Sequence, residues 1–381
     1  MSVSDSLKIA SDIHKHVRKR LRDSSILQHG TKLIDIANFI ETETKEYTAT
    51  ILDSINGLVT VPLYSCINGG IGFPVGLSVN DCAAHYHPHS LDHDVILSNS
   101  DILKVDFGTE INGWIIDSAF TYHVCDNEKT TNATTSKLKY NQNSHLDHHS
   151  SPHSFNMDDC ESLISCMKDA TYLGVKNIGV DGLISDWSSD IEELIRSHDG
   201  IHPIYNLTGH DIQHEIIHGN VRLPSVFNAV ANKNERFKEG VYAIETFGAR
   251  LPNCQEQKQE RKPMDNVEVE ERGEATIFRL NPDLAKYTTR DLQSHFRSPI
   301  FRIPSVQKTF SQICKRFKTL PFCERYMQPS DRTQIAILSK NGAIMSYPPL
   351  CCTRGSITAQ FEHTVLLKDS GVIIFSKDDD Y

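Results

Sequence analysis

The sequence has 381 residues, of which 39% are hydrophobic and 23% are charged. This composition is typical of a chain with one large core or two smaller ones, and it excludes collagen, coiled-coil and wholly disordered proteins. A formal net charge of −10 is the wrong sign for a protein whose main task is to bind phosphate backbones, so we expect no specific nucleic-acid partner. The sequence contains neither a run of about 18 apolar residues nor a signal-peptide pattern, so we expect a cytoplasmic protein without a membrane partner.

The first half of the chain begins with two predicted helices, over residues 7–21 and 32–48, where apolar residues recur at spacings of three and four. The Gly- and Pro-rich segment at 69–74 then predicts a turn. Residues 102–124, ILKVDFGTEINGWIIDSAFTYHV, contain two apolar, β-branched runs around Asn112-Gly113. This pattern predicts a β-hairpin.

The second half alternates between polar inserts and apolar elements. Residues 126–156 are dominated by polar residues, including several of the chain's 19 histidines, and predict an inserted loop with little to bury. Helical spacing resumes at residues 160–167 and 191–195, before a second polar insert at 254–273. Residues 274–346 predict a small helical subdomain, and the chain ends in a strand-like run, GSITAQFEHTVLL.

The hairpin carries the first candidate site residues. If residues 110–113 form a four-residue loop, Asp106 lies directly opposite Asp117 on the same face. Two carboxylates in otherwise apolar strands need a compensating cation or a shared proton. A register shifted by one or two residues, with one aspartate exposed to solvent, is an equally good interpretation of the hairpin alone.

Three further residues interrupt apolar surroundings. Glu245 stands in VYAIETF, Glu362 stands in the polar face of SITAQFEHTVLL, and His210 follows Gly209. Four carboxylates from separate strands with one imidazole favour a dinuclear site for Mn, Co, Zn or Fe over a thiolate-rich structural zinc site.

These five residues, in this chain order, resemble the metal ligands of the methionine aminopeptidases. The strings FPVGLSVNDCAAHY at 73–86, KVDFGTEINGWIIDSAFT at 104–121 and YPPL at 347–350 are similar to the type 2 branch, as is the helical insert between Glu245 and Glu362. The resemblance covers nearly the whole chain outside the two polar inserts. It implies the pita-bread fold, of α/β (α+β) class, as a single catalytic domain over residues 1–381 with the subdomain at 274–346.

The resemblance also implies a role for each site residue. Two divalent metal ions, of Co, Mn, Zn or Fe, would be bound by Asp106, Asp117, His210, Glu245 and Glu362, and would activate a water molecule whose proton Glu245 moves. His85 would form a hydrogen bond near the scissile amide, and His218 would stabilise the tetrahedral intermediate. The residues expected to bind the substrate methionine are Phe73, His85, Ile217, His218, Tyr347 and Leu350.

The implied activity is removal of the initiator methionine from the N-termini of nascent polypeptides, with a small penultimate residue, by a monomeric enzyme. The ribosome is a further candidate partner, although the sequence begins without the long charged extension of many eukaryotic members. The sequence departs from the family pattern at Thr208, in DIQHE at 211–215, and at Lys286, where many type 2 enzymes have a pocket histidine.

Two alternatives share the fold. An inactive binding protein of the proliferation-associated type is disfavoured because those relatives lack a complete ligand set. A proline-specific peptidase retains similar ligands, and it is disfavoured by the type 2 strings and the helical insert.

Overall fold

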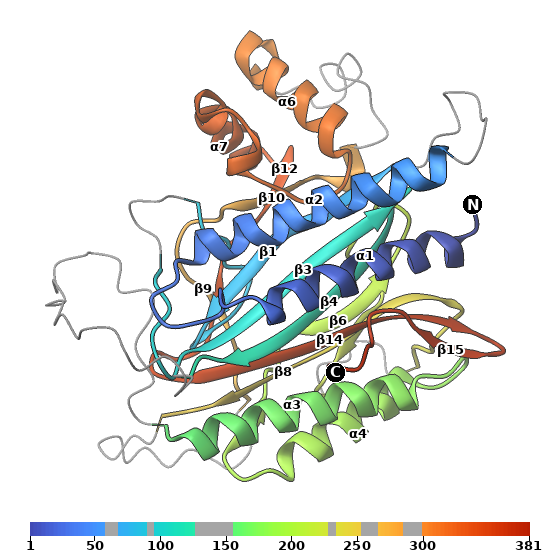
Figure 1. Cartoon of the computed structure of the whole chain (residues 1–381), viewed down its shortest axis with the longest axis vertical. Helices are drawn as coiled ribbons and strands as arrows, with labels where there is room; N and C mark the ends of the chain where they lie inside the picture. Colours follow the sequence, from blue (N-terminus) through green and yellow to red (C-terminus); the bar gives the residue numbers. More distant parts are fainter. Residues whose placement is uncertain (58–67, 90–94, 126–154, 228–233, 253–265, 285–298) are drawn as a thin grey trace, which may run out of the picture.

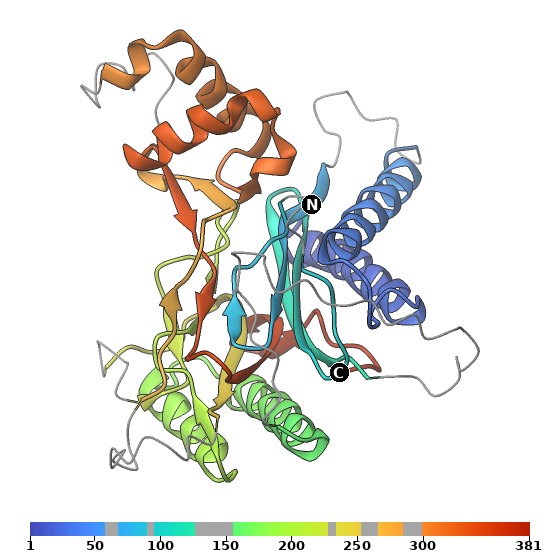
Figure 2. The same ribbon diagram turned by 90° about the vertical axis from the view of Figure 1, so that its left-hand side faces the viewer.

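The computed structural model describes residues 1–57, 68–89, 95–125, 155–227, 234–252, 266–284 and 299–381. Four long helices flank its two main sheets (Figure 1), and two shorter helices lie at one end of the molecule (Figure 2). The polar insert predicted at 126–156 falls almost wholly outside the described residues, as does Lys286. None of the helices in the described ranges is long and apolar enough to span a membrane.

Both N-terminal helices form as predicted, α1 over Val3–Asp23 and α2 over Leu33–Gly57. The first helix begins with a capping box, in which the Ser2 hydroxyl accepts from the Asp5 backbone N–H and the Asp5 carboxylate accepts from the Ser2 backbone N–H. The apolar stripe that predicted α1 is fully buried. Both helices cover the first main sheet (Figure 1).

The second pair of long helices is also confirmed, as α3 over Met157–Asn177 and α4 over Ile184–Arg196. Helix α3 packs against strands β8 and β14 of the second main sheet, and α4 packs on α3 (Figure 1). The two helix pairs therefore cover different halves of the molecule, with the strands between them.

Two antiparallel sheets form the centre of the fold. The first has the order β1-β3-β4, with β1 over Gly69–Val79, β3 over Ile102–Ile111 and β4 over Trp114–His123. The second has the order β15-β14-β8-β6-β7, and β5 also pairs with β8. Its strands are β5 (Ile201–Pro203), β6 (Thr208–Ile212), β7 (Arg222–Pro224), β8 (Gly240–Arg250), β14 (Ile357–Lys368) and β15 (Gly371–Ile374).

Side chains join the two sheets where β4 runs beside β14. The Thr364 hydroxyl accepts from the Asp117 backbone N–H at 2.8 Å and donates to the Asp117 carbonyl at 2.6 Å. The Thr121 hydroxyl forms the same pair of bonds with the backbone of Gln360, at 2.8 Å and 2.7 Å. These contacts set the polar face of β14 in fixed register against β4.

The predicted turn at 69–74 is wrong, because these residues open strand β1. Gly69 and Gly72 allow close strand pairing: a Cβ atom on Gly69 would lie 2.3 Å from the Ile111 side chain on β3, and one on Gly72 would lie 3.2 Å from the Gly108 backbone. Register shifts between Ile71 and Phe73, and between Phe73 and Gly76, accommodate Pro74.

The predicted hairpin forms, but its predicted register is wrong. The turn contains only Asn112 and Gly113, both with positive φ angles of 50° and 79°, so that Ile111 pairs with Trp114. Asp117 therefore lies opposite Gly108, and Asp106 lies opposite Ala119. The register is shifted by two residues, as the alternative interpretation allowed. Both aspartates nevertheless stay on one face and line one cavity, so the expectation of one solvated aspartate is wrong.

The predicted helical subdomain contains the two expected helices, α6 over Pro304–Phe317 and α7 over Arg332–Lys340. It also contains a small sheet of order β11-β10-β12 that the sequence interpretation omitted. Its strands are β10 (Ile277–Leu280), β11 (Phe322–Cys323) and β12 (Ile344–Tyr347), joined by short 3-10 helices at Pro282–Leu284, Pro299–Arg302, Glu324–Tyr326 and Pro329–Asp331. This unit has its own hydrophobic core.

The second predicted polar insert, 254–273, is only partly described. Its last residues are not simply polar filler, because Val267 and Val269 are buried. They lead into β9 (Glu270–Glu271), which forms a second small sheet with β13 (Leu350–Cys351) and β2 (Cys82–Ala84). The sequence interpretation missed this strand because the buried Val267 and Val269 alternate with exposed polar and charged residues.

Candidate metal centre

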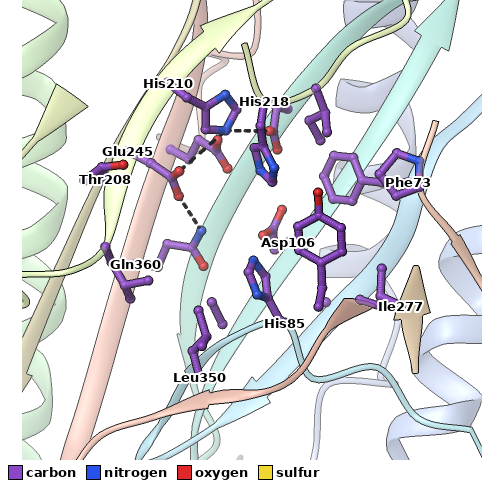
Figure 3. Close-up of a pocket in the computed structure, with 18 of the residues that line it drawn as sticks. Phe73, His85, Asp106, Thr208, His210, His218, Glu245, Ile277, Leu350 and Gln360 are labelled. Carbon is purple, nitrogen blue, oxygen red and sulfur yellow. Dashed lines mark hydrogen bonds and ion pairs between the residues drawn. The ribbon is translucent and has the colours of Figure 1, made fainter. Parts of the chain in front are cut away.

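The five predicted metal ligands lie around one cavity of about 280 Å³, which we call the central cavity. Each ligand comes from a different strand, and Figure 3 shows Asp106, His210 and Glu245 projecting into the same space. The strands are β3 for Asp106, β4 for Asp117, β6 for His210, β8 for Glu245 and β14 for Glu362. Three of the five, Asp117, His210 and Glu362, offer ligand atoms that all lie within 4.8 Å of one another.

Sheet register explains why these side chains meet. Glu245 and Glu362 are direct partners across β8 and β14, and His210 on β6 pairs with Ala243, two residues before Glu245. The Nε2 atom of His210 lies 3.6 Å from Asp117 Oδ2 and 3.7 Å from Glu245 Oε1. The imidazole thus stands between carboxylates from both main sheets.

A backbone contact orients the His210 ring. Its Nδ1 atom lies 3.2 Å from the Asp211 carbonyl oxygen, which can only accept, so Nδ1 carries the proton and Nε2 presents its lone pair to the carboxylates. Burial lowers the pKa of His210 to about 4, so the ring is neutral near pH 7. A neutral imidazole held in this way is suited to bind a metal ion.

The carboxylates are crowded and poorly compensated. Burial raises the pKa of Asp106 to about 7, and burial together with neighbouring carboxylates raises the pKa of Asp117, Glu245 and Glu362 well above their ordinary values. Asp106 Oδ1 and Glu362 Oε2 are buried without a hydrogen-bond partner. Among the described residues, only Gln360 donates a side-chain hydrogen bond to the group, at 3.1 Å to Glu245 Oε2.

This donor set fits divalent cations. Buried carboxylates that repel one another are stabilised by a positive charge, and four carboxylates with a neutral imidazole are the ligand types that Mn, Co, Zn and Fe accept. The orphaned oxygens of Asp106 and Glu362 supply the free lone pairs that such an ion needs. The residues present therefore fit a metal centre on structural grounds.

Two further histidines border the carboxylates. His85 follows β2 with a φ angle of 67°, a strained conformation for a residue with a side chain, and its ring packs edge-on against Tyr347 at 5.4 Å. The His218 ring lies edge-on to His210 at 4.4 Å and 5.7 Å from the Tyr347 ring. Burial lowers the pKa of His85 to about 4 and that of His218 well below its ordinary value.

Asp211, the first residue of the unusual DIQHE segment at 211–215, has a structural role in the loop that follows β6. Its carboxylate accepts from the Val221 backbone N–H at 2.7 Å and from the Gln213 side chain at 2.8 Å, and its carbonyl accepts from the Gly219 N–H at 2.8 Å. These bonds close the loop that carries Ile217 and His218. The charged residue therefore shapes the cavity wall from outside.

The predicted methionine-binding residues also meet at the central cavity. Phe73, Ile217, Tyr347 and Leu350 line it together with His85 and His218. All eleven residues of the predicted site thus line one cavity, while their individual catalytic roles stay predictions.

Sequence reasoning missed several residues of the wall. Gln360 could have been found, because it alternates with Glu362 on the polar face of β14. Ile277, Pro321 and Met345 carry no sequence signal for this position, since each is an ordinary residue of the subdomain. Two arginines, Arg222 and Arg279, were also missed.

Comparisons with known proteins agree with this geometry. Residues 5–263 match the family model of metallopeptidase family M24. The chain is 32% identical to methionine aminopeptidase 2 of Komagataella phaffii, over 97% of this chain and 69% of that protein. It is also 32% identical to methionine aminopeptidase 2 of Saccharomyces cerevisiae, over 99% of this chain and 76% of that protein.

Solved structures show the same fold. A thermophilic Arx1 superimposes with a TM-score of 0.70 at 15% identity, covering 100% of this chain and 93% of that one. A methionine aminopeptidase from Thermotoga maritima has a TM-score of 0.54 at 15% identity, covering 99% and 96%. The predicted pita-bread fold of mixed α/β class is confirmed. The chain belongs to metallopeptidase family M24 and, within it, to the type 2 methionine aminopeptidases.

Proposed function

We propose that this protein is a metal-dependent methionine aminopeptidase that removes the initiator methionine from nascent polypeptides with a small penultimate residue. The observation that carries the proposal is the meeting of Asp106, Asp117, His210, Glu245 and Glu362 at one cavity. The names of the similar proteins support the same reaction.

The five residues would hold two divalent ions of Co, Mn, Zn or Fe, and ligand atoms of Asp117, His210 and Glu362 lie closest together. When bound, such ions lower the pKa of a coordinated water and polarise the scissile carbonyl. Glu245 would accept and return a proton beside them. The hydrogen bond from Gln360 holds the Glu245 carboxylate at the centre of the site, 3.7 Å from His210 Nε2.

The neutral histidines would act on the substrate amide. His85 and His218 both lie against Tyr347, on the side of the cavity that faces the apolar wall. At neutral pH each ring offers one N–H donor and one acceptor nitrogen. The His218 N–H can donate a hydrogen bond to the oxyanion that forms during hydrolysis. His85 forms a hydrogen bond with the Pro348 backbone, so its other ring nitrogen would accept a hydrogen bond from the N–H of the scissile amide. Phe73, Ile217 and Leu350 would enclose the methionine side chain.

The cellular setting is part of the proposal. We place the protein in the cytoplasm as a monomer that acts on the N-termini of nascent chains, with the ribosome as a further candidate partner. The family membership of the chain supports this setting.

The proposal is tested by the release of free methionine from peptides. Metal-stripped protein, with and without added Mn or Co, is offered Met-Ala-Ser, Met-Leu-Ser and an Xaa-Pro dipeptide. We expect metal-dependent cleavage of Met-Ala-Ser and little cleavage of Met-Leu-Ser. Preferential cleavage of the Xaa-Pro peptide would favour the proline-specific alternative, and no cleavage by folded protein would favour the inactive binding protein.

A further inference from the structure

Arg279 lies in the wall of the central cavity without an anionic partner. Its side chain is only 7% exposed, yet its Nε and Nη1 atoms have no hydrogen-bond acceptor. Its Nη2 atom has only a weak contact, at 3.8 Å to the Met345 sulfur. Among the described residues, no carboxylate forms an ion pair with this guanidinium, although a buried charge without a partner is costly.

The strand register places Arg279 at the outer part of the cavity. On β10, Ile277 pairs with Tyr347 and Arg279 pairs with Met345 on β12. Side chains two residues apart share one face, so Ile277 and Arg279 both line the cavity. The Tyr347 ring contacts His85 and His218, whereas Met345 is 43% exposed. The Arg279–Met345 pair therefore lies closer to solvent than the Ile277–Tyr347 pair.

A second orphaned donor lies beside Arg279. The Tyr347 hydroxyl is buried without a hydrogen-bond partner, and the Arg279 guanidinium lies 5.8 Å from the Tyr347 ring. Arg222, on β7, also lines the cavity and is exposed. Burial raises the pKa of Tyr347, and the positive charges of Arg279 and Arg222 oppose that rise, as expected for cations close to the ring.

The cavity is thus bipolar. One end holds four carboxylates that fit cations. The other end holds the Arg279 guanidinium and the Tyr347 hydroxyl, whose hydrogen-bond donors have no acceptor. A ligand that satisfies the second end must carry an acceptor with negative charge, and a carboxylate matches a guanidinium best.

We propose that Arg279, with the Tyr347 hydroxyl, forms a subsite for a carboxylate of the substrate peptide and makes the enzyme prefer peptides with a negative charge close to the scissile bond. This inference rests on the proposed peptidase function. The carboxylate has two possible sources, an acidic side chain at the third residue or the terminal carboxylate of a short peptide, and the experiment distinguishes them.

The test compares matched peptides on the metal-loaded protein. Met-Ala-Glu-Ser amide and Met-Ala-Gln-Ser amide differ in one charge, and Met-Ala-Ser is offered as free acid and as amide. We expect kcat/KM to be at least about tenfold higher for the charged member of one pair, mainly through KM, because a charge-assisted hydrogen bond contributes to binding before the reaction. The pair that shows the difference identifies the source of the carboxylate.

Variants connect the preference to the residue. Arg279→Met removes the charge at similar length and should bring the ratio within the charged pair to about one. Arg302→Met, an exposed arginine of the same subdomain outside the cavity, serves as the matched control and should keep the ratio of the unaltered protein. A thermal melt of each variant excludes unfolding as the cause.

A binding measurement separates the two claims. Calorimetry on the metal-stripped protein, where no cleavage occurs, should show tighter binding of the charged peptide, and Arg279→Met should abolish the difference. Equal rates and equal affinities within both pairs would overturn the carboxylate subsite and leave the peptidase intact. No methionine release from any peptide, with charge-dependent binding retained, would overturn the peptidase and leave the subsite.

Discussion

Asp117 contacts its surroundings through both its backbone and its side chain. Its backbone N–H and carbonyl bond the Thr364 hydroxyl on β14, and its carboxylate lies 3.6 Å from His210 Nε2. The backbone contacts fix β4 against β14, while only the carboxylate enters the candidate metal centre. A change of the side chain alone can therefore separate the metal function from the fold.

Asp117→Asn should abolish methionine release while the protein stays folded. An amide keeps the shape but loses the negative charge of a proposed metal ligand, so the loss in kcat/KM should exceed the 10- to 100-fold that removal of an outer-shell partner typically costs, or about 100-fold at least. Peptide assays with a circular dichroism melt provide the measurement. Asp12→Asn, on the exposed face of α1, is the control. Near-normal turnover of Asp117→Asn would contradict the assignment of Asp117 as a metal ligand.

Gly108 couples the apolar wall to the metal centre. It pairs with Phe73 on β1 and with Asp117 on β4, and a Cβ atom at this position would lie 2.2 Å from the Phe73 ring. Gly108→Ala should therefore displace Phe73 from the cavity, with an overpacking cost of about 1–3 kcal/mol in unfolding free energy.

The measurement is the KM for Met-Ala-Ser together with a denaturant melt, and KM should rise. Gly70→Ala is the matched control on the same strand, because a Cβ atom there meets nothing within 4 Å. If both variants behave like the unaltered protein, Phe73 does not form the wall that we assign to it.

At the scale of elements, the C-terminal tail supports the strand that carries Glu362. The Tyr381 hydroxyl lies 2.7 Å from the Ser118 hydroxyl, which donates to the Glu362 carbonyl at 2.8 Å. The preceding Asp380 carboxylate accepts two bonds of 2.7 Å from Arg18 on α1. Helix α1 thereby anchors the tail behind β14.

This ion pair predicts a pH dependence of stability. Burial alone would raise the pKa of Asp380, but the hydrogen bonds and charge of Arg18, with a contribution from Arg22, hold it below its ordinary value of 3.8. A carboxylate with a lowered pKa in the folded state stabilises the protein above its unfolded pKa, and that stability is lost as pH falls through the folded pKa.

Asp380→Asn should accordingly lower the unfolding free energy by about 2 kcal/mol at neutral pH, because it leaves the buried Arg18 without its charged partner. The difference between the two proteins should be constant from about pH 7 to 5 and narrow below about pH 4. Denaturant melts across this range provide the measurement. A difference that persists unchanged below pH 3 would contradict the role of the ionised carboxylate.

The elements that the sequence predicts well are those with a strong local pattern. The buried stripe of α1 and the Asn112-Gly113 turn depend on neighbours in the chain, so their periodicity and turn chemistry suffice. The prediction of a turn at 69–74 was wrong because Gly69 and Gly72 are required by close contacts with β3, which lies more than 30 residues away in the chain. The predicted register of the β3–β4 hairpin was wrong because the sequence around Asn112-Gly113 is compatible with a loop of either two or four residues.

The candidate site shows the same division. The five ligands contrast with apolar neighbours or follow glycine, and the family resemblance supplies their roles. Arg279 carries no such signal, because an arginine in the short strand IFRL is usually solvated. Only the packing of the subdomain against the main sheets buries it in the cavity wall.

At the scale of the whole molecule, metal binding should stabilise the fold. The central cavity collects one ligand from each of five strands in two sheets, so an ion bound there joins both halves. An ion at 100 times its dissociation constant should raise the unfolding free energy by about 2.7 kcal/mol. Thermal melts with and without Mn should show this rise, and Glu362→Gln should reduce it. Identical melts for stripped and loaded protein would contradict the bridging of the two sheets.

The central claim is that the five residues form a dinuclear metal centre. The most direct measurement is the number of Mn or Co ions that the folded, metal-stripped protein retains after loading and gel filtration, counted by elemental analysis. We predict about two ions per chain for the unaltered protein and fewer for Glu362→Gln and Asp117→Asn. Folded protein that retains no ion above the buffer, with any of the candidate metals, would contradict the account.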